Sequence, residues 1–246
     1  MLQSQRQREI LTRLKLNPFL STKQLAKELN VSEMTIRRDF NELAGKGIIV
    51  REHGGALLPD EAEKQTSDSD DEKGNLAISK AAANLVSPGD CIFLDSSHTA
   101  LALLRFLQQQ VTIVTNSNLS GGTISGFKGE IILLGGSYDS KGAATYGSLC
   151  LANLQSFHFD CCFLSCAAVS LDNHKVYSRD TNGSLIKTTA LKLANRKVLL
   201  ADTGKFTEKG FYSFADLAEF DYLLSDYSEL DTKKIPHNTQ AIRVNK

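Results

Sequence analysis

Residues 20–43, LSTKQLAKELNVSEMTIRRDFNEL, decide the fold of the first part of this chain. They contain two apolar patterns at helical spacing, Leu25, Ala26 and Leu29 and then Ile36, Phe40 and Leu43. Ser21 precedes the first pattern, and Gln24 follows three residues later, which is the spacing of a capping box. Ser32 is placed to cap the second helix. The stretch therefore predicts two helices joined by a tight connection at Asn30-Val31.

The flanking residues complete a small domain. An apolar stripe over residues 10–16 predicts an earlier helix that ends at Asn17-Pro18. Gly45 and Gly47 are expected to end the third helix. Residues 48–51 and 56–58 then flank the turn sequence EHGG (52–55), which predicts strand, turn and strand. Three helices and a hairpin over residues 1–58 are typical of a winged helix-turn-helix.

The second helix of such a motif enters the DNA major groove with its N-terminal end first. Its outward face carries residue types that suit this role, because Arg pairs with guanine, Thr contacts the thymine methyl and Asn reads adenine. Arg51 and His53 are expected to reach the DNA backbone or minor groove as a wing. The predicted DNA contacts are Ser21, Ser32, Met34, Thr35, Arg37, Arg38, Asn41, Arg51 and His53. The alternative is a solvated, charged helix face.

Charge divides the chain. Residues 1–58 hold ten basic and six acidic side chains, whereas residues 59–74 hold two basic and seven acidic ones and few apolar ones. We therefore predict a mobile acidic linker at 59–74 and a second domain at 75–246. The N-terminal residues lack the apolar segment of a secretory signal, and no apolar run is long enough for a membrane helix, so a cytoplasmic protein is expected.

The second domain alternates β-rich runs with helical patterns, which favours an α/β fold with a mostly parallel sheet covered on both faces. The expected strands are Cys91–Asp95, Val111–Thr115, Ile131–Leu134, Cys161–Cys166, Lys197–Ala201 and Tyr222–Ser225. The expected helices are Ala77–Leu85, Thr99–Gln108, Tyr146–Phe157 and Leu185–Asn195. Five cysteines without a CxxC pair predict buried thiols, and neither a metal nor a cofactor is expected.

The segments RQREIL (6–11), 20–43 and GIIVREHGGA (47–56) resemble the DeoR-type winged helix-turn-helix. The resemblance continues through IFLDSSHTA (92–100), VTNSNLS (114–120), LLGGSYD (133–139), VLLADTGKF (198–206) and FDYLLSD (220–226). It implies a C-terminal sensor domain that is similar to ribose-5-phosphate isomerase, with Rossmann-like layers, and that binds a phosphorylated sugar or sugar-like metabolite. It also implies a homodimer or homotetramer that acts on operator DNA.

Ligands of open α/β sheets bind beyond the carboxyl ends of the strands, where these blocks lie. Asp95 is expected to accept sugar hydroxyls, the serines to hold a phosphate, and Lys205 to supply positive charge. The predicted effector contacts are Asp95, Ser96, Ser97, His98, Thr99, Thr115, Asn116, Ser117, Gly135, Gly136 and Lys205. The alternative is that these polar clusters only form loops and helix caps. Two interpretations also remain for His98: it senses the charge of a phosphate, or it is a surface or helix-capping histidine.

Several positions depart from the family pattern. Ala167 and Ala168 stand where an acidic residue and a glycine are usual, and Lys175 also replaces a glycine. Ser97 replaces the glycine of the DSSHTA block, and residues 181–183 lack an acidic residue ahead of Lys187. The pocket is therefore expected to take an atypical effector or none.

These features predict a sequence-specific transcription regulator, a repressor of a carbohydrate operon that a metabolite releases from DNA. One alternative is a DNA-binding protein whose second domain only oligomerises. The other is a sugar-phosphate isomerase fused to a DNA-binding domain. Sugar isomerisation needs a positioned carboxylate or histidine, and only Asp95 and His98 remain near the predicted pocket, so an enzyme is not expected.

Overall fold

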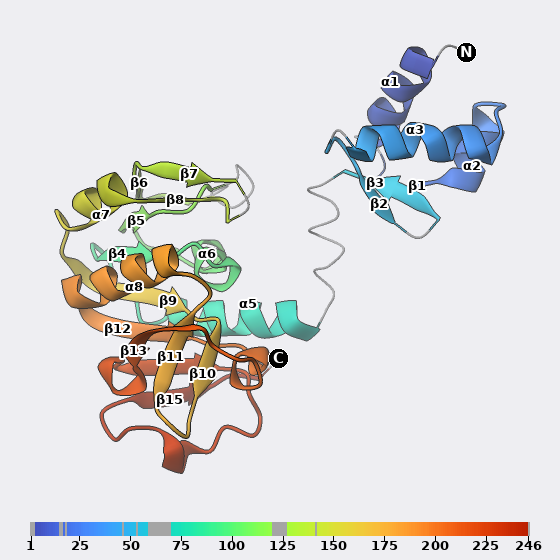
Figure 1. Ribbon diagram of the computed structural model, residues 1–246. Helices are drawn as coiled ribbons and strands as arrows, with labels where there is room; N and C mark the ends of the chain where they lie inside the picture. The colour runs from blue at the N-terminus through green and yellow to red at the C-terminus, as the bar shows by residue number, and fades with distance from the viewer. Residues whose placement is uncertain are drawn as a thin grey trace. The chain divides into compact units, whose positions relative to one another are not determined.

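The computed structural model describes residues 3–14, 17, 19–45, 47–52, 54–58, 70–119, 127–140 and 142–245 (Figure 1). The chain divides into two compact units, Met1–Ser69 and Asp70–Lys246. Within the described ranges, no helix has the length and apolar character that crossing a membrane requires.

The first unit contains three helices and a small sheet. Its elements are α1 (Gln3–Leu14), β1 (Phe19–Ser21), α2 (Thr22–Glu28), α3 (Glu33–Gly45), β2 (Val50–Glu52) and β3 (Gly55–Leu57). The antiparallel order β1-β3-β2 places the predicted hairpin beside a third strand that the sequence did not predict. β1 is only three residues long, too short to show an alternating pattern. The winged helix-turn-helix prediction is confirmed.

Local chemistry sets the ends of the helices. Asn30 has a φ of 51°, so the connection between α2 and α3 passes through the left-handed region that Asn tolerates. Gly47 follows α3 with a φ of 69°, and the N–H groups of Gly47 and Ile48 return to the carbonyls of Ala44 and Leu43 at 2.9 and 3.0 Å. This bond pair is a Schellman motif, which ends α3 at the predicted position.

Only half of the predicted capping box forms. The Ser21 hydroxyl accepts the N–H of Gln24 at 3.5 Å, but the Gln24 side chain donates to Glu28 at 2.8 Å instead of returning to Ser21. Ser21 remains the N-cap of α2.

A buried ion pair joins α1 to α3. Arg6 and Asp39 are 8% and 0% exposed. Arg6 Nε and Nη2 donate to the two carboxylate oxygens of Asp39, the second at 3.2 Å. Ile10, Ile36 and Phe40 are fully buried in the core of this unit. Two parallel donor–acceptor contacts fix the orientation of α1 as well as its distance from α3.

The second unit is built on a seven-stranded sheet in which every pairing is parallel. Its order is β15-β14-β12-β9-β4-β5-β6. The strands are β4 (Cys91–Leu94), β5 (Thr112–Thr115), β6 (Glu130–Leu133), β9 (Phe159–Ser165), β12 (Ala194–Leu200), β14 (Tyr222–Ser225) and β15 (Gln240–Arg243). The predicted parallel α/β fold is confirmed, although β15 was not expected.

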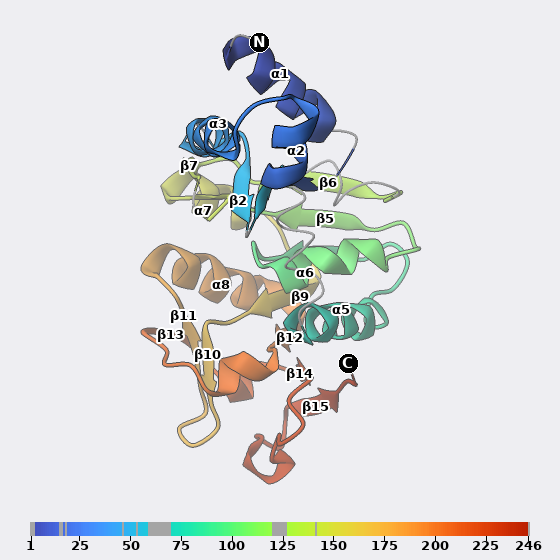
Figure 2. The same ribbon diagram turned by 90° about the vertical axis from the view of Figure 1, so that its right-hand side faces the viewer.

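Helices cover both faces of this sheet (Figure 2). On one face lie α5 (Asp70–Ala83), α6 (His98–Ala102) and the short helix η2 (Leu103–Arg105); on the other lie α7 (Ser148–Leu154) and α8 (Thr181–Leu193). Cys161 belongs to the α5/α6 core and Cys162 to the α7/α8 core, so the two thiols face opposite sides of β9 as alternation requires.

Short antiparallel strands complete the unit. β7 (Ser137–Asp139) pairs with β8 (Ala144–Tyr146). β10 (Ala168–Ser170), β11 (Lys175–Ser178) and β13 (Tyr212–Asp216) form a second small sheet. Val169, Val176 and Phe214 from this sheet pack in the α7/α8 core. None of these strands was predicted.

Several sequence-based boundaries differ from the structure. α5 begins at Asp70, so residues 70–74 of the predicted linker are helical, while residues 59–69 lie outside the described parts. Buried Ile78, Ala82 and Ala83 pack this helix on the sheet, and such packing sustains polar turns that composition alone assigns to a linker. Tyr146 belongs to β8, and α7 starts at Ser148. α8 ends at Leu193 because β12 begins at the next residue.

Replacing Arg6 by Met is expected to lower the free energy of unfolding of the first unit by about 3–5 kcal/mol, because the buried carboxyl of Asp39 loses the guanidinium that it pairs with. Hydrogen exchange of peptides from residues 3–58 in the full chain measures the loss. Arg13→Met is the matched control, because its partners Glu9 and Glu28 are exposed and such pairs contribute about 1 kcal/mol or less. Equal losses in the two variants would contradict the role of the buried pair.

Candidate functional site

The recognition helix α3 has one buried and one open face. Ile36, Phe40 and Leu43 are at most 2% exposed, whereas Met34 is 73% exposed. The predicted outward residues Arg37, Arg38 and Asn41 are exposed as well, and Thr35 is half-buried. The helix therefore presents a mixed basic and amide surface on a closed core, which is the arrangement that a helix in the major groove requires.

Ser32 and Thr35 define the start of this helix. The Ser32 hydroxyl accepts the N–H of Thr35 at 3.1 Å and lies 2.8 Å from the Thr35 hydroxyl. The cap predicted for Ser32 therefore forms, and it also orients the Thr35 side chain.

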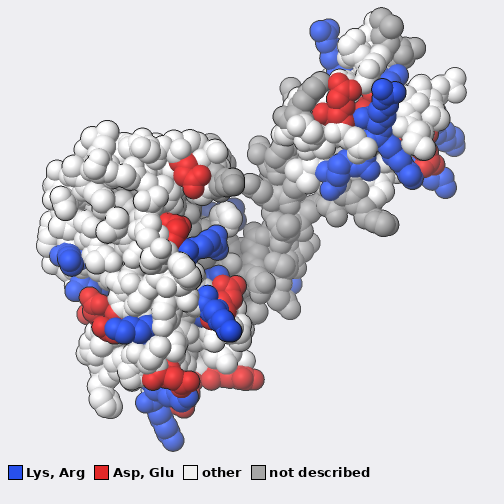
Figure 3. Space-filling view, viewed as in Figure 1, with Lys and Arg blue, Asp and Glu red and all other residues white. Residues whose placement is uncertain are grey.

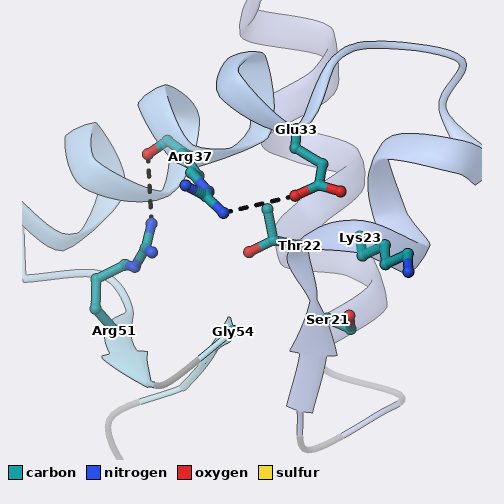
Figure 4. Close-up of a pocket in the computed structure, with 7 residues that line it drawn as sticks. All are labelled: Ser21, Thr22, Lys23, Glu33, Arg37, Arg51 and Gly54. Carbon is teal, nitrogen blue, oxygen red and sulfur yellow. Dashed lines mark hydrogen bonds and ion pairs between the residues drawn. The ribbon is translucent and has the colours of Figure 1, made fainter.

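A hollow of about 370 Å³ lies beside the recognition helix (Figure 4). It is lined by Ser21, Thr22, Lys23, Glu33, Arg37, Arg51 and Gly54. The Thr22 N–H donates to the Gly54 carbonyl at 2.8 Å, which joins α2 to the turn of the hairpin. Three cationic side chains against one carboxylate suit an anionic partner, and Figure 3 shows Lys and Arg gathered on the visible face of this unit.

Arg51 does not extend outward as a wing contact, in contrast to the prediction. Its Nη1 donates to the Arg37 carbonyl at 3.4 Å (Figure 4) and to the Asn41 amide oxygen at 3.3 Å. The guanidinium also lies over the Phe40 ring, 5.4 Å from its centroid. Stacking and two acceptors on α3 hold Arg51 against the recognition helix. His53 lies outside the described residues.

In the second unit, Asp95 lies just beyond the carboxyl end of β4 and is 2% exposed. One carboxylate oxygen accepts the Ser97 N–H at 2.9 Å. The other accepts the Ser165 N–H at 2.7 Å, the Ser165 hydroxyl at 3.2 Å and the ammonium of Lys187. The carboxylate is therefore surrounded by donors from the chain itself, and its predicted role as an acceptor of sugar hydroxyls stays a prediction.

Lys187 is the functional candidate that the sequence analysis missed. Burial alone would raise the pKa of Asp95, but the charge and hydrogen bond of Lys187, with the bonds from Ser97 and Ser165, lower it below its ordinary value. Asp95 and Lys187 are 92 residues apart in the chain. The only signal in the sequence was the family's helix lysine, which does not identify its partner.

The other predicted effector contacts are spread over this end of the sheet. Ser96 is hydrogen-bonded to Tyr146, whose phenol pKa is raised by burial and by nearby carboxylates. His98 is exposed at the start of α6. The hydroxyl of Thr99 donates to Asn75 on α5 at 2.7 Å, and its contact with a ligand stays a prediction.

Thr115 is the last residue of β5 and Asn116 and Ser117 follow it, and all three are buried. The Asn116 side-chain N–H donates to the Thr145 carbonyl at 3.0 Å. Its amide oxygen is buried and accepts no hydrogen bond from the described residues. Asn116 therefore keeps one acceptor available at the carboxyl edge of the sheet.

The two predicted glycines, Gly135 and Gly136, lie in the connection between β6 and β7. Gly136 has a φ of 151°, and a Cβ there would lie 2.5 Å from the Tyr146 carbonyl, so this glycine permits packing on β8. Gly135 is exposed beside it.

Lys205, in the short helix η3 (Thr203–Phe206), is 3.7 Å from Asp202 and 4.0 Å from Glu208. These contacts are long, so the ammonium of Lys205 remains available to an anion.

Residues in the range 165–168, which departs from the family pattern, take part in hydrogen bonds and packing within the second unit. The Ala167 N–H donates to the Tyr177 carbonyl at 2.7 Å, and Ala168 is buried in β10. Burial raises the pKa of the Cys166 thiol to about 12, although Lys187 and Lys205 oppose the rise. No cluster of three or more metal-ligating side chains occurs among the described residues.

The chain matches the DeoR-like helix-turn-helix domain over residues 6–62 and the DeoR C-terminal sensor domain over residues 70–227. It belongs to the DeoR family of transcriptional regulators. The HTH-type transcriptional repressor GlcR of Bacillus subtilis is 32% identical over 92% of this chain and 89% of that protein. The lactose phosphotransferase system repressor of Lactococcus lactis is also 32% identical, over 80% of this chain and 81% of that protein.

Ribose 5-phosphate isomerase A of Neisseria gonorrhoeae aligns with 56% of this DeoR-family chain and 54% of its own length. The TM-score is 0.40 and the sequence identity is 13%, a likeness too low to bear on function.

Lys187→Met is expected to cost about 3–5 kcal/mol of stability at pH 7, because it leaves the Asp95 carboxylate buried without its cation. In the native protein the lowered pKa of Asp95 adds stability above its ordinary value near 3.9, and this is lost as the pH falls through the lower folded value. In the variant, burial dominates and raises that pKa, so the variant loses stability as the pH rises. The deficit should therefore shrink from pH 7 toward pH 4.

Urea unfolding of the full chain across this pH range measures the deficit. Lys205→Met is the matched control, since its carboxylate contacts are 3.7 and 4.0 Å long, and it should cost less and show little pH dependence. A Lys187→Met deficit that stays constant with pH would contradict the assigned ion pair.

Proposed function

We propose that this DeoR-family protein is a sequence-specific DNA-binding repressor of a carbohydrate operon, and that a phosphorylated sugar or related metabolite releases it from DNA. The observation that carries the proposal is the open face of α3, where Met34, Arg38 and Asn41 stand exposed above the buried Ile36 and Phe40. The related GlcR and lactose repressors are named for repression, which favours the same outcome here.

The carboxyl edge of the parallel sheet supports a site for an anionic metabolite. The ammonium of Lys205 makes only long contacts with carboxylates, at 3.7 and 4.0 Å, and Asn116 keeps a buried acceptor. The loop after β4 carries the hydroxyl of Ser96. A cation suits a phosphate, and an amide oxygen suits a sugar hydroxyl. In this proposal Asp95 positions Lys187 and Ser97 for the ligand and does not contact it.

The same geometry argues for a non-enzymatic role. A general base is most effective with a pKa near the working pH, whereas Asp95 has a lowered pKa and accepts four hydrogen bonds. We also propose at least a homodimer, because two winged helices would occupy repeated half-sites, and a cytoplasmic location, because the protein would act on DNA.

Arg38→Ala is expected to reduce affinity for the operator by about tenfold or more, because an exposed arginine on the recognition helix supplies base or phosphate contacts. Fluorescence anisotropy on DNA from upstream of the protein's own gene, with competitor DNA present, measures this. Arg105→Ala, which removes an exposed arginine of the sensor domain, is the control and should bind normally. Undiminished operator affinity in Arg38→Ala would overturn the assigned DNA face.

The effector half of the proposal is tested on the same DNA with a panel of sugar phosphates. One of them should lower the affinity of the native protein, and Lys205→Met should require a higher concentration of it because the variant lacks the ammonium. Specific DNA binding that no sugar phosphate changes would favour a second domain that only oligomerises.

A further inference from the structure

Asn41 is the one predicted base-reading residue whose side chain is held by another part of the fold. Its amide oxygen lies 3.3 Å from Nη1 of Arg51, which comes from β2 of the wing sheet. A guanidinium has five N–H donors and no acceptor. Only the oxygen of the Asn41 amide is therefore compatible with Arg51, and the NH2 group is the part of the amide that takes no part in this contact.

Arg51 is itself fixed in place. It pairs with Ala56 across the hairpin, its guanidinium stacks on the buried Phe40 ring at 5.4 Å, and its Nη1 also bonds the Arg37 carbonyl at 3.4 Å. Its Nε is buried without a hydrogen-bond partner among the described residues. The charge is thus partly desolvated on the side that faces α3, which strengthens its hold on the amide oxygen.

An amide with this orientation prefers a particular base edge. Adenine is read by an amide that both donates to N7 and accepts from the N6 amino group. Guanine presents two acceptors in the major groove, N7 and O6, and matches an NH2 group alone. The positive charge of Arg51 at the amide oxygen also disfavours the approach of the adenine amino group.

We propose that Asn41 reads a guanine in the operator half-site and that Arg51 is a positioning residue that sets this preference. This rests on the proposed DNA-binding function and replaces the expectation that Asn41 reads adenine. Arg51 acts through Asn41, so its own contact with the DNA is not required.

The test is selection of bound duplexes from a randomised DNA library by the full-length protein, followed by anisotropy on the selected sequence and on its single-base variants. The native protein should select a motif containing a guanine whose replacement by adenine weakens binding about tenfold. Asn41→Ala should select the same motif with that one position relaxed.

Two variants of Arg51 separate positioning from general support of the wing. Arg51→Lys still offers only donors to the amide oxygen and should keep the guanine preference. Arg51→Met keeps an apolar stem against Phe40 but frees the amide to rotate, so adenine should be accepted within about threefold of guanine. A purely structural role for Arg51 would weaken all sequences alike in both variants and leave the base ratio unchanged.

The outcomes are distinct. Absence of any selected motif with the native protein overturns the proposed function itself. A selected motif with adenine at the Asn41-dependent position, or a uniform loss of affinity in Asn41→Ala without relaxed sequence choice, leaves that function standing and overturns the guanine assignment. Melting temperatures of the variants within a few degrees of the native value confirm that folded proteins are being compared.

Discussion

A single buried carboxylate organises the carboxyl edge of the parallel sheet. Asp95 follows β4, which lies between β9 and β5 in the strand order. It takes the Ser97 N–H at the start of α6, the Ser165 N–H at the end of β9 and the ammonium of Lys187 on α8. Because α6 and α8 cover opposite faces of the sheet, one side chain joins three layers. Burying this charge costs several kcal/mol unless every lone pair is used, so this end of the domain tolerates little change in geometry.

The sequence predicted the central strands of the sensor domain but not the contacts that Asp95 makes. The apolar runs CIFL in β4, CCFL in β9 and VLL in β12 identified the central strands because strands buried on both faces are continuously hydrophobic. β7 and β10 have only three residues each and carry no such signal. Likewise, the block around Asp95 placed this residue correctly at the edge of the sheet, but the block did not show that the carboxylate is paired with Lys187. That contact depends on how α8 folds over the sheet, which local patterns do not contain.

In the winged domain too, the sequence predicted which face of a helix is buried but not which of its polar side chains hold the fold together. Helical periodicity predicted which face of α3 is buried, and Ile36, Phe40 and Leu43 are indeed in the core. Periodicity does not tell which polar side chains serve the fold itself. Asp39 is fully buried with Arg6, and Arg51 lies against Asn41 instead of extending from the wing. Polar residues near a DNA-reading helix therefore divide into those available to DNA and those that hold the helix, and only tertiary contacts separate the two groups.

Hydrogen bonds connect Asp95 to α5, the first helix of the second unit. Asp95 accepts the Ser97 N–H, and the Ser97 hydroxyl caps α6 through the Ala100 N–H at 3.1 Å. Within α6, the Thr99 hydroxyl donates to Asn75 at 2.7 Å, and the Thr99 carbonyl accepts the Ser79 hydroxyl at 2.7 Å, both on α5. A ligand that draws Lys187 away from Asp95 would weaken the start of α6. Through Thr99 it would also weaken the two hydrogen bonds that join α6 to α5. Such a ligand would shift the protein between two arrangements only to the extent that it binds one of them more tightly.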